Sequence, residues 1–238
     1  MNRALYAAAT GMVAQQRQLE TIADNLANAD VTGFRRATAT FEALEGGFGT
    51  APTGTMRSFE QGKLERSGGP FDVAIEGEGF FGVARDGARA YTRAGAFSRA
   101  ADGTLRNAEG WRLEGLRVPA DALGLDVRAD GRVTARFAGG ASRGLGRIAL
   151  TGFDAPERLR PIGSALFAAT AEAGRARAVA VGGERGSRIA FGMLERSNVS
   201  IYEAMIGILT AQRAYEANAK GVQAADEMQR IANNLHRA

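Results

Sequence analysis

Three glycines near the middle of the chain have the spacing of a nucleotide-binding loop. Gly77, Gly79 and Gly82 fit the pattern G-x-G-x-x-G within "DVAIEGEGFFGV", residues 72 to 83, and they follow a run, 71–75, that is typical of a strand. Asp102 lies further along the chain, near the place where a dinucleotide site has the acid that binds the ribose. This spacing raises the possibility of an enzyme that uses a nucleotide cofactor.

The residues that follow these glycines argue against a nucleotide site. A dinucleotide fingerprint needs a helix directly after the glycines, so that the pyrophosphate meets the helix N-terminus. Here the glycines lead into "FFGVARDGARAYT", in which Asp86-Gly87 predicts a β-hairpin. Asp102 falls inside another predicted Asp-Gly turn. We therefore expect no bound nucleotide, and titration of the protein with nicotinamide or adenine nucleotides would test the enzyme hypothesis.

Other catalytic chemistry has few residues to work with. His236, two residues from the C-terminus, is the only histidine, and the chain has no cysteine. A zinc site, a Ser-His-Asp triad, a disulfide framework and thiolate chemistry all need residue types that are scarce or missing here. No spacing of carboxylates singles out a catalytic pair. The sequence therefore predicts a protein that is not an enzyme and has no metal ion or other cofactor.

Composition indicates an ordinary folded protein. Of 238 residues, 45% are hydrophobic and 24% are charged, and the formal net charge is +4. The cations are arginines except for Lys63 and Lys220, and they are scattered among acids, so we expect no nucleic-acid binding. No apolar run approaches the length of a membrane span, so we expect no membrane insertion. Residues 1–20 are interpreted as the start of a mature helix, because their periodicity continues past any cleavage point of a signal peptide.

Glycine and proline divide the chain into three segments. Residues 46–192 contain 28 of the 32 glycines and all five prolines. Both residue types are disfavoured inside helices and common in turns between short strands. The predicted fold class is α+β, with N- and C-terminal α-helices that pair as a coiled-coil-like stalk and a central, mainly antiparallel all-β domain. The expected domains are residues 1–45, 46–192 and 193–238.

The two ends carry apolar rows at helical spacing. In the first helix the row alternates steps of three and four over residues 5–29, and the segment ends where Asp30, Thr32 and Gly33 supply turn chemistry. The last helix is predicted to begin after Ser197-Asn198, either of which could be its N-cap. The apolar seam expected to mediate assembly comprises Leu5, Met12, Leu19, Ile22, Leu26, Met205, Ile208, Tyr215 and Val222. The same pattern also fits two ordinary amphipathic helices that cover one domain.

The middle segment is predicted to contain many short strands. Asp-Gly occurs at 86–87, 102–103 and 130–131, each time between runs that favour strands. Asp-Gly between such runs is a strong local signal for a hairpin. The glycines at 77 and 79 are interpreted as sites of tight backbone turns beside the bulky pair Phe80-Phe81.

Four stretches, in order along the chain, resemble the bacterial flagellar rod and hook proteins. They are "NLANADVTGFRR" (25–36), "DVAIEGEGFFGV" (72–83) with "YTRAGAF" (91–97), "GMLERSNVS" (192–200) and "QRAYEANAK" (212–220). Asp24 stands where the family commonly has Asn. The motif residues that carry the resemblance are Asn25, Leu26, Asn28, Thr32, Gly33, Phe34, Gly77, Gly79, Phe80, Phe81, Asn198, Gln212, Arg213, Tyr215 and Glu216.

The resemblance implies a structural subunit of the basal-body rod that self-assembles into a hollow, torque-transmitting shaft between motor and hook. It implies export without a cleaved signal by the flagellar type III apparatus, a location in the rod that crosses the periplasm, and contacts with other rod and hook proteins and with surrounding rings. The family places the paired terminal helices in the inner wall and the β domain outside.

Several alternatives stay open at this point. The distal rod type is favoured, but the somewhat short middle segment also allows a proximal rod or another hook–basal-body axial protein. Trp111 gives some support to a carbohydrate-binding or adhesive β domain carried on helical stalks, although such a tryptophan is more often a core residue. Asn25 and Asn28 could cap the end of the first helix or contact a neighbouring subunit directly.

Overall fold

The protein is described by a computed structural model that covers residues 3–44, 49–183 and 186–235. His236 lies outside these described residues. The chain divides into two compact units that are discontinuous in sequence. The first contains both long helices and a β-hairpin, from residues 1–28, 36–58 and 199–238; the second contains residues 29–35 and 59–198. The domain boundaries expected at residues 45/46 and 192/193 stay a prediction.

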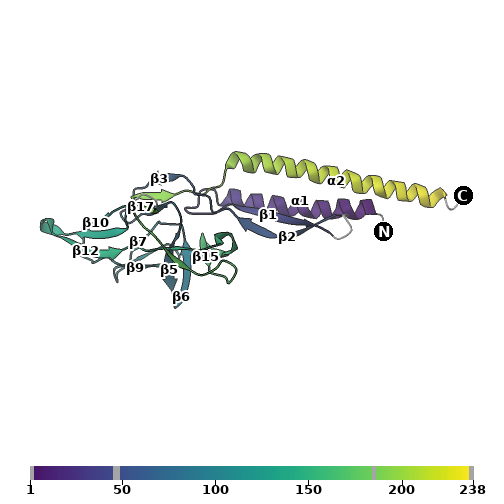
Figure 1. Ribbon diagram of the computed structural model, residues 1–238. Helices are drawn as coiled ribbons and strands as arrows, with labels where there is room; N and C mark the ends of the chain where they lie inside the picture. Colours follow the sequence, from purple (N-terminus) through teal and green to yellow (C-terminus); the bar gives the residue numbers. More distant parts are fainter. Residues whose placement is uncertain (1–2, 45–48, 184–185, 236–238) are drawn as a thin grey trace. The chain divides into compact units, whose positions relative to one another are not determined.

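Two helices and one hairpin form the first unit. Helix α1 (Arg3–Ala27) lies between helix α2 (Ile201–Leu235) and the antiparallel strands β1 (Ala37–Ala43) and β2 (Thr50–Arg57) (Figure 1). Among the described residues, no helix combines the length and the apolar composition that a membrane crossing requires.

The two helices run antiparallel and touch mainly through small residues. Gly207 lies against Ile22 and Gly221 lies against Ala8, so residue numbers rise along one helix as they fall along the other. A Cβ atom at Gly207 would come within 2.9 Å of Ile22 Cδ1, which shows how closely the backbone of α2 approaches α1. The buried positions of α2 recur at heptad spacing. They are Ala204, Ala211 and Ala225.

Helix α1 also uses a second row of residues, which faces the hairpin. Asn25 bonds twice to Ala37 of β1: its Nδ2 donates to the carbonyl oxygen (2.6 Å), and its Oδ1 accepts from the backbone N–H (2.8 Å). Near the other end of α1, the Thr10 hydroxyl oxygen accepts from the N–H of Thr50 in β2 (3.4 Å). One apolar seam along α1 therefore describes only part of its packing.

The start of α2 corrects one prediction. Neither Ser197 nor Asn198 is the N-cap, because the helix begins at Ile201. Ser200 caps it instead, with its side-chain oxygen accepting from the N–H of Glu203 (3.3 Å). Ser197 and Asn198 belong to the second unit, where Asn198 bonds to Glu60.

The second unit is built from antiparallel sheets. Its largest sheet has nine strands. Seven of them follow the order β14 (Arg160–Gly163), β15 (Leu166–Ala168), β6 (Ala88–Thr92), β5 (Phe80–Arg85), β9 (Arg112–Arg117), β8 (Thr104–Arg106) and β7 (Ser98–Arg99). The other two are β13 (Leu150–Gly152), which pairs with β5, and β16 (Arg177–Val179), which pairs with β13.

The remaining strands form three smaller sheets. One contains β10 (Gly124–Val127), β11 (Arg132–Arg136) and β12 (Ser142–Arg147). The other two pair β17 (Arg188–Phe191) with β4 (Val73–Glu76), and β18 (Met193–Glu195) with β3 (Leu64–Arg66). All these strand pairs are antiparallel, which confirms the predicted α+β class with a central antiparallel β region.

Strand β5 lies between two apolar clusters. Phe80 and Phe81 point to opposite faces of the strand, as successive residues must. Phe81 joins the larger cluster, which also contains Trp111, whereas Phe80 packs with Tyr91 and Phe153 in the smaller one. Trp111 is therefore a core residue, and its indole ring is not available to stack on a sugar.

The three predicted Asp-Gly hairpins are confirmed. They connect β5 to β6, β7 to β8, and β10 to β11. The segment after Gly77 and Gly79 is strand β5, so no helix N-terminus faces these glycines and Asp102 lies in a turn. The geometry of a dinucleotide fingerprint is therefore not formed.

Candidate functional site

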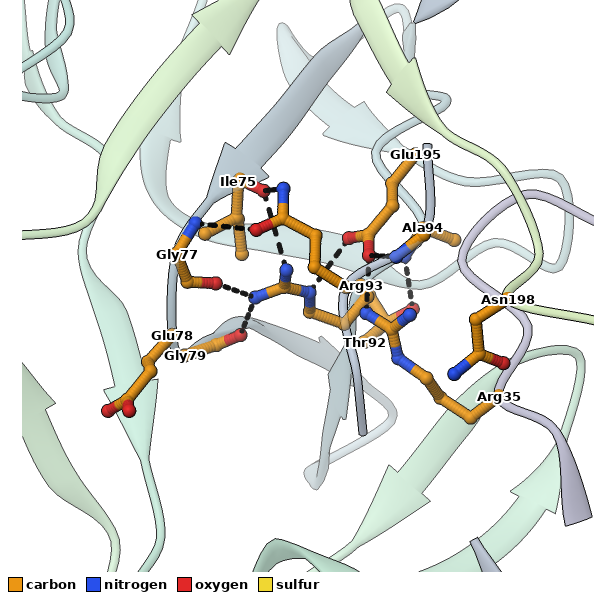
Figure 2. Close-up of polar contacts among 12 residues, drawn as sticks. Arg35, Ile75, Gly77, Glu78, Gly79, Thr92, Arg93, Ala94, Glu195 and Asn198 are labelled. Carbon is orange, nitrogen blue, oxygen red and sulfur yellow. Dashed lines mark hydrogen bonds and ion pairs between the residues drawn. The ribbon is translucent and has the colours of Figure 1, made fainter. Parts of the chain in front are cut away.

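In the second unit, residues from four distant parts of the chain, Glu195 included, meet at one buried carboxylate. Glu195 ends strand β18, and its side chain is fully buried. Its Oε1 accepts from Arg35 Nη2 (2.6 Å) and from the backbone N–H of Gly62 (2.8 Å), and its Oε2 accepts from Arg93 Nε (2.9 Å) (Figure 2). We refer to Arg35, Arg93 and Glu195 as the buried arginine–glutamate network.

Arg93 explains the spacing of Gly77 and Gly79. Its Nη1 donates to the carbonyl oxygens of both Gly77 and Gly79, each at 2.8 Å, and its Nη2 donates to Ile75 O (3.4 Å) (Figure 2). Gly77 and Gly79 have φ values of 105° and 107°, a backbone conformation that L side chains rarely adopt. The two glycines therefore let the chain aim its carbonyl oxygens at the Arg93 guanidinium, whereas a phosphate site would need backbone N–H groups in that place.

Gln61 supports the same loop from its other side. Its Oε1 accepts from the N–H of Gly77 (2.9 Å), and its Nε2 donates to Ile75 O (3.1 Å). The backbone of the 75–79 segment is thus fixed by a glutamine amide as well as by Arg93. Buried backbone polar groups are seldom left without partners, and here side chains provide those partners.

Burial affects the charge balance of the network. Burial lowers the pKa of Arg35 from its usual value; the Glu195 carboxylate opposes this shift and the nearby Arg93 guanidinium adds to it. Arg35 Nη1 also donates to Glu60 O (3.0 Å). Two guanidinium groups share one carboxylate, so the network depends on its hydrogen bonds to offset the loss of water around three charges.

Backbone contacts hold the residues beside the network in place. The N–H of Gly33 donates to the main-chain oxygen of Glu195 (2.8 Å), and a Cβ at Gly33 would lie 2.4 Å from Ala94 N, closer than real Cβ contacts come. The N–H of Asn198 donates to Phe34 O (3.4 Å), and its Nδ2 donates to Glu60 O (3.0 Å). The segment that follows α1 is therefore joined to the segment that precedes α2.

Asparagines near the end of α1 have separate roles within the chain. Asn25 is buried and holds β1, as described above. Asn28 Nδ2 donates to the carbonyl oxygen of Asp24 (2.8 Å), one of the last carbonyls of the helix, so its side chain caps the helix end. Thr32 is half-buried in the turn that follows.

The structure places the predicted seam residues along the helix pair. The candidates on α1 (Leu5, Met12, Leu19, Ile22 and Leu26) are all half-buried, as are Ile208 and Val222 on α2. Met205 and Tyr215 are exposed. The motif residues Gln212, Arg213 and Glu216 are exposed on α2. Within the monomer the seam residues are therefore only partly covered.

Sequence reasoning did not single out the three charged residues of the network, although each stands in a motif that it quoted. Arg35 lies in "TGFRR", Arg93 in "YTRAGAF" and Glu195 in "GMLERSNVS". The available signal was limited to Arg93, a lone charge among small and apolar residues directly after a strand, because Arg35 and Glu195 each stand beside another charged residue. Pairing across 160 positions of sequence has no local signature.

The network has the properties of a structural element. Its charged groups are bonded to one another and to backbone groups. Within the described ranges, no group of three or more His, Cys, Asp or Glu side chains could hold a metal ion.

Comparisons with known proteins match all three parts of the chain. The model for "Flagella basal body rod protein" matches residues 5–35, that for "Flagellar hook protein FlgE/F/G D1 domain" matches 74–135, and that for "Flagellar basal body rod FlgEFG protein C-terminal" matches 191–235. The flagellar basal-body rod protein FlgG of Borreliella burgdorferi is 38% identical, and the alignment covers 100% of both chains. The chain belongs to the flagellar basal-body rod protein family.

Two further relatives also match nearly the whole chain. FlgG of Agrobacterium fabrum is 37% identical over 96% of this chain and 97% of its own. FlgF of Caulobacter vibrioides, which carries a different rod protein name, is 31% identical over 98% of this chain and 97% of its own. The relatives named FlgG agree with the expected distal rod type. As a member of the rod family, the protein is a structural component of the flagellar basal body. The buried network joins residues from all three matched segments, since Arg35, Arg93 and Glu195 lie in one each.

Proposed function

We propose that copies of this chain assemble into the hollow shaft of the rod through apolar residues of α1 and α2. The shaft transmits torque from the motor to the hook. The observation that carries this proposal is an exposed apolar row at the start of α2. Tyr202, Met205, Ile206 and Leu209 follow the i, i+3, i+4, i+7 spacing of one helix face, and their exposed fractions run from 56% to 83%.

The packing of α2 within the monomer leaves this apolar row uncovered. Helix α2 turns its small residues, Ala204 and Ala211, toward α1 and leaves large apolar residues in water. Burial of one Leu or Ile side chain contributes about 1.5 to 3 kcal/mol, so a few such residues per contact suffice for firm assembly. A neighbouring copy offers matching surface in its half-buried seam residues Leu5, Met12, Leu19, Ile22, Leu26, Ile208 and Val222 and in the exposed Tyr215.

A head-to-tail contact of this kind builds an open filament when its rotation does not close into a ring. The stalk segments, 1–45 and 193–238, would then form the inner wall, and residues 46–192 would face outward. The further partners we propose are other rod and hook proteins, the rings around the rod and the flagellar type III export apparatus, which would deliver the subunit across the inner membrane. The family membership supports these assignments.

A pair of matched variants tests the proposal. Ile206→Asp puts a charge in the middle of the exposed row, whereas Gln223→Asp puts one at an exposed polar position on the same helix. We expect Ile206→Asp to abolish swimming and to remove rods from purified basal bodies seen by electron microscopy, while Gln223→Asp swims normally. Tryptophan fluorescence from Trp111 monitors the fold of the second unit in both variants. Normal rods and swimming in Ile206→Asp, with the fold intact, would overturn the proposal.

A further inference from the structure

The chain contains three Asp-Gly pairs in three hairpin turns, and the structure distinguishes one of them chemically. The pairs are 86–87, 102–103 and 130–131. In any Asp-Gly pair, the glycine nitrogen can attack the aspartate Cγ and form a five-membered succinimide. Two properties control that step: whether the carboxyl group is free to turn toward the nitrogen, and whether the nitrogen is accessible.

Two of the three aspartates are bonded to other groups. Asp102 Oδ1 accepts from the Thr104 N–H (3.0 Å) and hydroxyl (2.7 Å), and its Oδ2 accepts from Arg106 Nη2 (2.7 Å). These bonds lower the pKa of Asp102 to about 2 and keep it ionised, which disfavours loss of its oxygen as water. Asp130 is bonded in the same manner, to the N–H and the Nε of Arg132.

The glycines in these two turns are equally constrained. The N–H of Gly103 donates to Ala100 O (2.9 Å), and that of Gly131 donates to Arg128 O (2.8 Å). Both glycines are also crowded: a Cβ at Gly103 would lie 2.6 Å from Val118 O, and one at Gly131 would lie 2.8 Å from Ile148 O. The nitrogen that must attack is bonded, and close backbone neighbours restrict the movement of each glycine that the attack would require.

The turn at 86–87 differs in every one of these respects. The Asp86 side chain is 94% exposed, and its carboxylate lies 3.9 Å from Arg85 Nε, too far for a hydrogen bond. No heavy atom lies within 4 Å of a Cβ built on Gly87. The structure shows no hydrogen bond from the Gly87 N–H to another described residue. The Asp86 backbone has a φ of 52°, an uncommon conformation for a residue other than glycine.

We infer that Asp86-Gly87 is a site of spontaneous aspartate isomerisation in the folded protein, whereas the two other Asp-Gly pairs are protected by their turns. The new bond joins Gly87 N to Asp86 Cγ, and the carboxyl oxygen leaves as water with two protons, one of them from the amide. Water then adds to either carbonyl of the succinimide. Addition at the α-carbonyl yields isoaspartate, which inserts one extra backbone carbon into the two-residue turn between β5 and β6, where Arg85 faces Ala88.

The test incubates the full chain at neutral pH and 37 °C, both folded and in concentrated urea. Isoaspartate at each pair is measured by peptide mapping and by enzymatic methylation with a protein isoaspartyl methyltransferase. In the folded protein we expect several-fold more isoaspartate at 86 than at 102 or 130, and in urea we expect comparable amounts at all three. Asp86→Glu removes the signal at 86, because a glutamate cannot close the five-membered ring.

A second variant tests the protection itself. Thr104→Ala removes the hydroxyl that bonds to Asp102, and we expect isoaspartate at 102 to rise in the folded protein while the amount at 130 stays unchanged. Circular dichroism before and after incubation confirms that the chain is folded. The inference is overturned if the folded protein shows the same proportions as the urea-treated protein, or if the 102 or 130 site exceeds 86.

Discussion

At the residue scale, Glu195 is the position where replacing one atom, a carboxylate oxygen, is expected to cost the most stability. Its carboxylate pairs with the guanidinium groups of both Arg35 and Arg93. Removing one partner of a buried ion pair costs about 3 to 5 kcal/mol, because the remaining charge keeps its burial and loses its compensation. Glu195→Gln keeps the shape of the side chain but removes the negative charge that the two guanidinium groups share.

We therefore expect Glu195→Gln to lower the free energy of unfolding by about 3 to 5 kcal/mol. Chemical denaturation of the full chain, followed by Trp111 fluorescence, measures the loss in the unit that holds the network. The control is Glu65→Gln, since Glu65 is an exposed partner of Lys63 and Arg196, at 3.3 and 3.5 Å. Exposed ion pairs contribute about 0 to 1 kcal/mol. Equal losses in the two variants would show that the network has no special structural role.

At the element scale, the helix pair depends on residues too small to dominate a hydrophobic pattern. Ala204, Ala211 and Ala225 are the buried residues of α2, and Gly207 brings its backbone close to Ile22. A pattern search gives weight to large apolar residues and therefore identified Met205 and Tyr215, which the monomer leaves exposed. The existence of both helices could be predicted from spacing, and Ile22 of the predicted seam does lie against α2. The small residues that α2 turns toward α1 could not be predicted in this way.

Other elements also show that features set by neighbouring residues could be predicted, whereas features set by residues far apart in the sequence could not. The Asp-Gly hairpins could be predicted because each glycine supplies the positive φ that its turn needs. The hairpin of β1 and β2 was not predicted, because its strands are rich in Thr and Ala and show little alternation of buried and exposed residues. The buried network was missed because its partners are brought together only by the complete fold of the second unit.

The close contact of the two helices leads to a prediction at position 211. Ala211→Leu inserts a large side chain where Ala211 is 1% exposed, and overpacking of this kind costs about 1 to 3 kcal/mol. Ala217→Leu adds the same atoms at an exposed position of the same helix and is expected to be nearly neutral. Thermal unfolding monitored by circular dichroism at a helical wavelength compares the two. Similar melting temperatures would mean that α1 and α2 do not pack through this row.

At the scale of the whole molecule, the two units bury apolar surface very differently. The second unit encloses a core in which Phe81, Val83 and Ile75 have no exposed surface. In the first unit α2 leaves Tyr202, Ile206 and Leu209 more than half exposed. Long helices gain most of their stability from tertiary packing of an apolar face. In the monomer, the first unit therefore leaves large apolar side chains exposed, whereas the second unit encloses its own core.

Hydrogen exchange tests this difference between the units directly. In a dilute sample that sedimentation shows to be monomeric, we expect amides of residues 5–26 and 201–231 to exchange faster than those of strand β5, because local opening exposes little additional apolar surface in the helix pair. On assembly, residues 201–209 should gain the most protection, since neighbouring copies would then cover their apolar row. Strand β5 provides the internal reference, because its burial does not depend on a partner. Strong protection of residues 5–26 in the monomer, equal to that of β5, would show that the chain satisfies its own helices and has no need of a second copy.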